Sequence, residues 1–179
     1  RGRVPVIAHV GDAFTRQTAE HARAAREVGA DFIAVIAPFY APYSEKELVS
    51  HYAAVAEVSG GPILIYQHPW TGQPPLQAET IVKLVAAGIV TGIKESSGDL
   101  EYFRSLLEAA RNAGVQLRSF HGSAASAMAS LMMGSSGLIS VLANLVPGTC
   151  VELFEAVNAG EVVRAEESQS RLTALNDGI

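Results

Sequence analysis

The chain has 179 residues, of which 49% are hydrophobic and 17% charged, and its formal net charge is −5. This length and apolar content suit one domain spanning residues 1–179, and the acidic balance argues against nucleic acid as a partner. A single cysteine excludes an internal disulfide framework, and no apolar run reaches the roughly 20 residues of a membrane helix, so we expect a cytoplasmic protein without membrane contact.

Short apolar runs alternate with longer segments of helical period along the whole chain. The expected strands are 4–10, 32–38, 62–69, 90–96, 117–123 and 137–144. The helices expected between and after them are 16–29, 44–58, 77–88, 99–114, 124–134 and 147–160, and a further helix covers 161–177. Strict alternation of strands and helices implies a parallel sheet, and the mostly apolar strands imply that both faces of the sheet are covered.

Two folds with a parallel sheet fit this pattern, a (β/α)₈ barrel and an open doubly wound sheet. The positions of the polar residues discriminate between them. Five polar side chains fall at the C-terminal ends of expected strands: His9, Tyr66, His68, Lys94 and His121. That end of the strands carries the chemistry of (β/α)₈ barrel enzymes. A doubly wound nucleotide-binding sheet would require a glycine fingerprint after the first strand, where this chain has "GDAFTRQ". We therefore predict an α/β fold of the (β/α)₈ barrel type, represented by about six βα units.

Lys94 is a candidate catalytic residue, because it ends an apolar strand and is followed by small residues at 96–98. The ordinary interpretation is a lysine whose stem packs on apolar surface while its amine stays in water. Space beside the amine would instead admit a carbonyl substrate, and partial burial favours a neutral amine that can form a Schiff base. The other two lysines, Lys46 and Lys83, lie on expected helices and are interpreted as solvated surface charges.

Tyr66 ends the neighbouring expected strand in "ILIYQHP". A buried tyrosine is usually a core residue whose hydroxyl group has a hydrogen-bond partner. Beside a lysine on the adjacent strand, the same hydroxyl group could relay protons during imine formation. Spacing alone leaves both interpretations open.

Several motifs together resemble one known family. They are "IAPFY" (36–40), "YQHP" (66–69), "GIKESSGDL" (92–100), "HGSAASAMASLMMGSSGLISV" (121–141) and "AN" (143–144). The chain resembles the dihydrodipicolinate synthase / N-acetylneuraminate lyase family from about residue 3 to about residue 175. The resemblance implies a class I, pyruvate-dependent aldolase on a (β/α)₈ barrel. It would act on pyruvate or another 2-oxo acid plus an aldehyde through a lysine Schiff base, without a metal or organic cofactor, as a homodimer or homotetramer.

The resemblance also assigns roles to particular residues. Lys94 matches the Schiff-base lysine, and Tyr66 matches the tyrosine that relays protons and contacts the pyruvate carboxylate. Further residues are expected to bind substrate or to lie beside the site: Tyr40, Gly122, Ser123 and Ile139. Tyr40 matches an aromatic position near the dimer contact, and the Ile139 backbone matches a wall of the pyruvate pocket.

Departures from the family pattern narrow the range of second substrates that we expect. No arginine lies between Pro69 and Lys83, where synthase members hold the second substrate's carboxylate. Residues 123–125 are Ser-Ala-Ala, which cannot replace the acidic side chains that hold sugar hydroxyls in sialic-acid lyases. "GSA" at 122–124 resembles hydroxy-oxoglutarate aldolases, so aldolases or dehydratases of that kind or of 2-keto-3-deoxy sugar acids are the alternative. Trp70 is either a lid or contact residue or a wall for a flat or apolar aldehyde.

The length is also a departure, because a (β/α)₈ barrel typically takes about 250 residues. Counterparts of the family's first two strand units are missing, and its C-terminal helices are cut short. We therefore expect this chain to be part of a longer barrel and to be inactive alone.

Two other functions remain open. His9, His68 and His121 fall on alternate strands, which a barrel places in one layer, so three imidazoles could bind zinc with an open position for water. A barrel that binds pyruvate without turnover, such as a sensor, is the other alternative; the presence of both Tyr66 and Lys94 argues against it.

Overall fold

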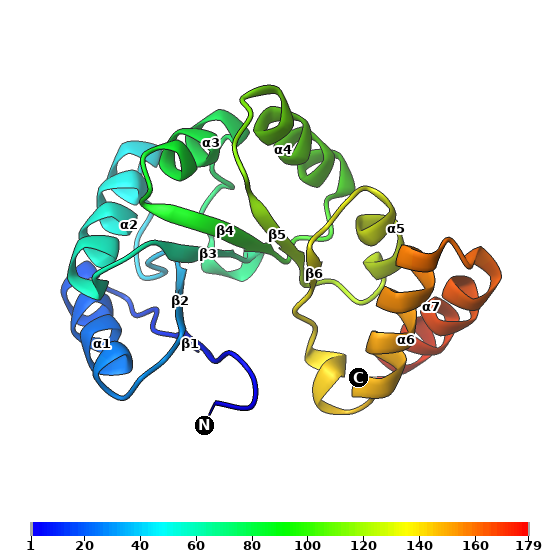
Figure 1. The fold of residues 1–179 in the computed structure, drawn as a ribbon. Coiled ribbons are helices and arrows are strands. Elements are labelled where there is room, and N and C mark those ends of the chain that lie inside the picture. The colour runs from blue at the N-terminus through cyan, green and yellow to red at the C-terminus, as the bar shows by residue number, and fades with distance from the viewer. Residues whose placement is uncertain (1, 179) are drawn as a thin grey trace.

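The computed structural model describes residues 2–178 as a curved parallel sheet covered on its outer side by helices (Figure 1). The strands are β1 (Ile7–His9), β2 (Phe32–Ile36), β3 (Ile63–Gln67), β4 (Val90–Glu95), β5 (Arg118–His121) and β6 (Gly137–Leu138). The helices are α1 (Thr15–Glu27), α2 (Glu45–Ser59), α3 (Ala78–Ala86), α4 (Leu100–Asn112), α5 (Ala127–Met132), α6 (Pro147–Ala159) and α7 (Val162–Asn176). Two 3₁₀ turns, η1 (Pro69–Thr71) and η2 (Val141–Asn144), follow β3 and β6.

The strands pair in chain order, from β1 to β6, and each pairing is parallel. Within the described residues, β1 and β6 each have one neighbour, so the sheet is an open arc (Figure 1). This arrangement is the one expected of a partial (β/α)₈ barrel. The predicted fold class is therefore confirmed.

Local sequence explains where several helices begin and end. Ser44 starts α2 with a capping box, in which its side chain accepts from the Glu47 N–H and the Glu47 side chain accepts from the Ser44 N–H. Gly60 ends the same helix in a left-handed conformation, with φ of 69°. Asp99 starts α4, because its carboxylate accepts hydrogen bonds from two backbone N–H groups of the first turn.

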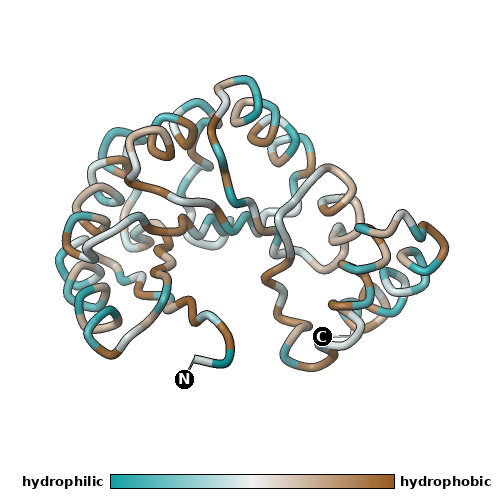
Figure 2. The backbone as a smooth tube through the Cα atoms, viewed as in Figure 1, coloured by the Kyte–Doolittle hydropathy of each residue, from teal (hydrophilic) through white to brown (hydrophobic). Residues whose placement is uncertain are grey.

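Side chains alternate between the two faces of each strand, and this alternation places the core. Ile33, Val35, Ile65 and Ile93 have no exposed surface and pack against the helices on the outer face. A second apolar cluster joins α5, α6 and α7 around Leu142. Figure 2 shows hydrophobic residues along much of the strands and hydrophilic residues on the outward turns of the helices. The residues that alternate with the core positions therefore line the inner, concave face of the arc.

Three elements differ most from the bounds that the sequence predicts. Pro5 has no backbone N–H, and β1 begins only at Ile7, after the predicted start at residue 4. The sixth strand is limited to two residues, because the Ser140 hydroxyl accepts the Leu142 N–H and starts a 3₁₀ turn. The predicted helix 124–134 is shortened to α5, Ala127–Met132.

Across residues 2–178, none of the helices combines the length and the apolar character that crossing a membrane would require.

Candidate active site

Lys94 and Tyr66 lie side by side on the concave face, at the C-terminal ends of two neighbouring strands. They are direct register partners across β3 and β4, and the next partner along the same row is Phe120 of β5. Lys94 Nζ lies 4.0 Å from the centroid of the Tyr66 ring. An amine over the face of a tyrosine ring is a cation–π contact, so the ring orients the amine in its resting state.

A row of edge-to-face aromatic contacts surrounds this pair. The Tyr66 ring centroid lies 5.5 Å from that of His9 and 5.8 Å from that of His68. The row continues from His68 to Trp70 at 5.3 Å, and Trp70 is 69% exposed. His68 is held in place because its Nδ1 accepts the Trp70 N–H at 3.3 Å. Aromatic rings therefore line the rim beside the lysine, and the row of rings ends in solvent at Trp70.

The two histidines beside Tyr66 favour the neutral form. Burial lowers the pKa of His9, and the positive charge of Lys94 lowers it further. The pKa of His68 is lowered by the same two causes in the same order. At neutral pH both imidazoles can therefore accept and donate protons close to the lysine.

The hypothesis of a zinc site formed by His9, His68 and His121 is wrong in its geometry. His9 and His68 both contact Tyr66 on the concave face. His121 directly follows Phe120, the register partner of Lys94, and therefore faces the opposite side of the sheet, where it is fully buried. Residues 2–178 contain no group of three or more His, Cys, Asp or Glu side chains placed to hold a metal ion.

Gly122, Ser123 and Ile139 lie at the C-terminal ends of β5 and β6. The Gly122 N–H donates to the Glu95 carbonyl at 2.7 Å, and the Ile139 N–H donates to the His121 carbonyl at 3.0 Å. A side chain at Gly122 would collide with the Ser96 hydroxyl group, so this crossing of the two strand ends requires glycine. These residues share the rim with Lys94, and the main chain is closely packed there.

Tyr40 lies apart from the lysine, in the loop between β2 and α2. It is 80% exposed, and its ring lies 6.1 Å from that of Phe14, which is also exposed. The structure therefore groups Tyr40 with an apolar surface beside the rim and not with Tyr66.

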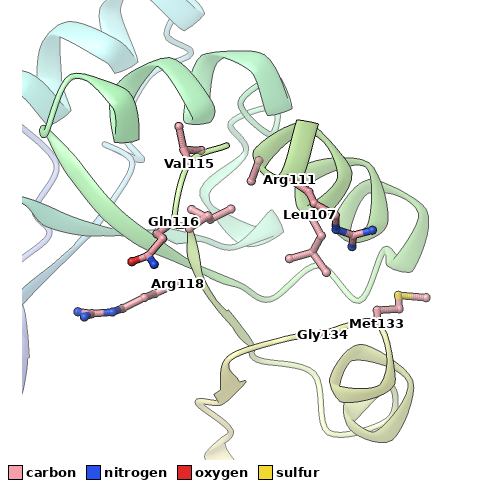
Figure 3. A pocket seen from close by; sticks show the side chains of 9 residues that line it. Leu107, Arg111, Val115, Gln116, Arg118, Met133 and Gly134 are labelled. Carbon is pink, nitrogen blue, oxygen red and sulfur yellow. The ribbon is translucent and has the colours of Figure 1, made fainter. Parts of the chain in front are cut away.

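Several hollows lie away from the C-terminal rim, and two of them adjoin strands of the sheet. A small apolar hollow of about 90 Å³ on the concave face is lined by Ile7, Phe32, Leu64, Thr91, Arg118 and Phe120. A larger one of about 520 Å³ opens beside the start of β5, at the opposite end of the strand from His121 (Figure 3). In Figure 3 the guanidinium groups of Arg111 and Arg118 point away from each other, so this hollow does not gather positive charge.

Sequence reasoning placed His9 and His68 at the same rim as Tyr66 but assigned them a specific role only as metal ligands, so it missed their contacts with the Tyr66 ring. These contacts could have been predicted, because side chains alternate between the two faces of a strand. Residues two apart on a strand share a face, so Tyr66 and His68 could have been placed together, whereas Phe120 and His121 could not.

Comparison with known proteins gives consistent results. The chain matches the model of the Dihydrodipicolinate synthetase family over residues 1–179. It is 35% identical over 176 residues to a 4-hydroxy-tetrahydrodipicolinate synthase from Acidithiobacillus ferrooxidans, covering 98% of this chain and 60% of the relative. It is 38% identical over 169 residues to an uncharacterized DapA-like lyase from Halobacterium salinarum, covering 94% of this chain and 54% of that protein.

A solved structure has the same arrangement. The prophage protein YagE of the dihydrodipicolinic acid synthase family, from E. coli K12 in complex with pyruvate, superimposes with a TM-score of 0.92 at 29% identity. The match covers 98% of this chain and 59% of that one. The chain therefore spans a little over half the length of the proteins it matches.

Proposed function

Since this chain belongs to the dihydrodipicolinate synthetase family, we propose that it carries the reacting lysine of a class I aldolase or lyase. Lys94 would form a Schiff base with the keto carbon of pyruvate or another 2-oxo acid. The observation that carries this proposal is the position of Lys94 Nζ, 4.0 Å from the Tyr66 ring centroid on the concave face. Lys46 and Lys83 lie on the helices α2 and α3, and both are exposed to solvent.

The proposed chemistry begins with a neutral Lys94 amine. Its nitrogen attacks the keto carbon, the carbonyl oxygen takes up a proton, and loss of water leaves an iminium ion. The adjacent carbon of the iminium loses a proton to give an enamine, which adds to the aldehyde carbonyl and forms the carbon–carbon bond while the aldehyde oxygen takes up a proton. In the reverse direction that bond breaks, the aldehyde leaves, and the enamine carbon takes up a proton. Hydrolysis then returns the lysine and the 2-oxo acid product. The lysine supplies the covalent attachment, so these steps need no metal or organic cofactor.

Tyr66 is the proposed proton relay for these steps. Its ring contacts the amine, and two imidazoles whose pKa values are lowered flank it. A hydroxyl group in this position can deliver a proton to the departing oxygen and recover it from the amine. His9 and His68 would keep the surroundings of the relay neutral.

The proposed second substrate is an aldehyde without a carboxylate or a row of sugar hydroxyls at its far end. The chain has no arginine between Pro69 and Lys83, and residues 123–125 carry no acidic side chain. Trp70 extends the aromatic row outward from Tyr66 through His68 and would form a wall against a flat or apolar aldehyde. Aldolases of hydroxy-oxoglutarate or 2-keto-3-deoxy sugar acids are the alternative within the family.

Self-association is part of the proposal, as a homodimer or homotetramer in the cytoplasm. The support is the exposed aromatic surface formed by Tyr40 and Phe14 beside the rim, which a second subunit would cover.

The experiment that tests this function is reductive trapping. The protein in its full natural length is incubated with pyruvate and borohydride, and the modified residue is located by peptide mass spectrometry. We expect the mass of a reduced pyruvyl adduct on the peptide that contains Lys94. Lys94→Ala should abolish the adduct, whereas the matched variants Lys46→Ala and Lys83→Ala should retain it. An adduct on another lysine, or none in the wild type, would rule out the proposal.

A further inference from the structure

A buried acid–base pair lies directly behind the lysine. Glu95 and His121 are register partners across β4 and β5, and both point to the helix-facing side of the sheet with no exposed surface. Glu95 Oε2 lies 3.6 Å from His121 Nδ1. Among residues 2–178, each of these two atoms is buried without a hydrogen-bond partner.

The remaining polar atoms of the pair are already engaged. Glu95 Oε1 accepts the Ser97 N–H at 2.6 Å. His121 Nε2 lies 2.8 Å from the Ser126 hydroxyl oxygen, and the Phe103 ring packs edge-on against the imidazole at 5.1 Å. The two unpartnered atoms therefore face each other from side chains that are fixed at their other ends.

A single proton would satisfy both atoms when small side-chain rotations bring them from 3.6 Å to about 3 Å, the length of a hydrogen bond. A buried polar atom without a partner is costly, so an arrangement that pairs these two is favoured. A water molecule cannot bridge them, because its two hydrogen-bond partners would have to be about 5 Å apart. A carboxyl proton on Glu95 Oε2 could be donated to Nδ1, and Nε2–H could then be donated to Ser126.

We propose that Glu95 and His121 share one proton as a neutral hydrogen-bonded pair, and that this pair positions the end of β4 so that Lys94 is aligned for reaction. The second part rests on the function proposed above. Glu95 and His121 are positioning residues, because they act through the main chain and do not touch the lysine's side of the sheet.

The main chain links the pair to the reactive rim. Lys94 directly precedes Glu95 and points to the opposite face. The Glu95 carbonyl accepts the Gly122 N–H at 2.7 Å, and the Ser96 N–H donates to the Gln67 carbonyl at 3.0 Å. Through its side chain Glu95 holds the Ser97 N–H as well. The pair therefore ties β4, β5 and the loop 96–98 together one residue from the reacting amine.

The surroundings favour the neutral arrangement. Burial raises the pKa of Glu95, and the charge of Asp99 raises it further, against the hydrogen bonds from Ser97 and Gly98 that lower it. Burial also lowers the pKa of His121, so both changes move the proton toward the carboxyl group. The titratable groups that face the pair are Asp99 and Tyr102 of α4, and burial raises the pKa of Tyr102 to about 12, so it stays neutral. Helix α5 contributes no titratable residue.

Three substitutions distinguish loss of the hydrogen bond between Glu95 and His121 from general effects of mutation. Glu95→Gln reproduces the protonated carboxyl, because its carbonyl can accept from Ser97 while its amide donates to Nδ1 of His121. Glu95→Leu removes both hydrogen bonds. Glu108→Gln is the matched control, since the Glu108 side chain on α4 is 46% exposed and its carboxylate accepts a hydrogen bond from Arg104 at 2.7 Å.

The first measurement is the ¹⁵N NMR spectrum of the His121 imidazole. We expect a neutral ring with a proton on Nε2 and none on Nδ1 throughout the range from about pH 5 to 8. Glu95→Gln should keep this tautomer. A charged ring, or a proton on Nδ1, in that range would overturn the neutral pair.

The second measurement is the rate of borohydride trapping of pyruvate at Lys94 across the same pH range. Glu95→Gln and Glu108→Gln should match the wild-type rate and pH profile within about twofold, and Glu95→Leu should be at least about tenfold slower, because small displacements of a reacting group are costly. If Glu95→Leu traps at the wild-type rate, or if Glu95→Gln changes the pH profile, the positioning role is wrong.

Failure of the proposed function would be recognised separately. If the wild type forms no adduct, the function fails, but the tautomer of His121 still decides whether the pair exists. Hydrogen exchange then decides its structural role: Glu95→Leu should speed exchange of the Ser97 and Gly122 amides, and Glu95→Gln should not. Equal exchange in all three proteins would contradict positioning.

Discussion

The ring of Tyr66 and its hydroxyl group have different roles at the scale of single residues. The ring face holds the Lys94 amine at 4.0 Å from its centroid, whereas the hydroxyl group is the proposed proton relay. Phenylalanine keeps the ring and loses the hydroxyl group, and leucine loses both. These two variants therefore distinguish orientation of the amine from transfer of protons.

We expect Tyr66→Phe to slow turnover by about two to four decades, the usual contribution of a positioned acid–base group. Tyr66→Leu should be slower still, because the amine also loses the surface that orients it. Steady-state kinetics of the aldol reaction provide the measurement. An unchanged rate for Tyr66→Phe would show that the hydroxyl group relays no protons.

Gly122 is the second residue for which we make a specific prediction, and this prediction concerns stability. A Cβ atom there would meet the Ser96 hydroxyl group, and it would lie only 3.2 Å from the Glu95 carbonyl oxygen. We expect Gly122→Ala to reduce the free energy of unfolding by about 1–3 kcal/mol, as overpacking does. Gly148→Ala is the matched control, because a Cβ at Gly148 has no neighbour within 4 Å. Urea unfolding measures both; equal stabilities would show that the rim has room for a side chain.

Among the secondary-structure elements, the contact between α1 and α2 contains a buried histidine that should make stability depend on pH. His51 Nδ1 forms a hydrogen bond with the Thr15 hydroxyl group at 2.9 Å, and Nε2 has no partner among residues 2–178. Burial lowers the pKa of His51 to about 4, and the neighbouring Ile36 backbone only partly opposes this shift. The folded protein therefore holds this imidazole neutral, whereas the unfolded chain protonates it below its ordinary pKa.

Because the folded-state pKa is the lower one, the stability contribution is present above about pH 6.5 and is lost as the pH falls toward 4. We expect the free energy of unfolding to fall on the order of 3 kcal/mol over this interval from His51 alone. His51→Gln should flatten the dependence, measured by urea unfolding at several pH values. His21→Gln is the matched control for replacing a histidine, since that side chain is 54% exposed. An unchanged slope in His51→Gln would contradict this account.

Element existence and type were predictable from sequence, but several boundaries and side-chain directions were not. The six parallel strands with their alternating helices, the partial barrel and the family resemblance are confirmed. The ends of β1 and β6 were overextended, since Pro5 and the hydroxyl group of Ser140 act locally against strand pairing. The direction of His121 was misjudged because its position along the chain was considered and the alternation of strand faces was not.

The candidate site was partly predictable for the same reasons. Lys94 and Tyr66 are register partners, which their places at the ends of neighbouring strands indicated. Glu95 and His121 are likewise register partners, but a single sequence does not show that their side chains approach to 3.6 Å beneath the helices. The substrate-binding roles of Gly122, Ser123, Ile139 and Tyr40 stay predictions.

At the scale of the whole molecule, the open arc leaves backbone and apolar groups at its two ends. In the described part of the chain, β1 and β6 pair on one side only, and Val4, Val6 and Ile7 are exposed by 70, 50 and 42%. Unpaired strand edges with apolar side chains promote association with other chains. The small apolar hollow on the concave face adds surface that would gain from being covered.

We therefore expect the 179-residue chain on its own to self-associate in a concentration-dependent way, measured by size-exclusion chromatography with light scattering. Ile7→Lys should shift the distribution toward monomer, because Ile7 lies on the edge strand β1 and a lysine on an edge discourages pairing. A wild-type chain that is monomeric at every concentration would show that the unpaired strand edges do not cause self-association.

The central claim is that the amine of Lys94 bonds covalently to a keto acid beside Tyr66. A crystal of the full-length protein soaked in pyruvate tests it most directly. The account predicts continuous electron density from Lys94 Nζ to the keto carbon, with the Tyr66 hydroxyl group next to the new bond. Pyruvate lying unbonded beside the lysine, or an amine turned away from the concave face into solvent, would contradict it.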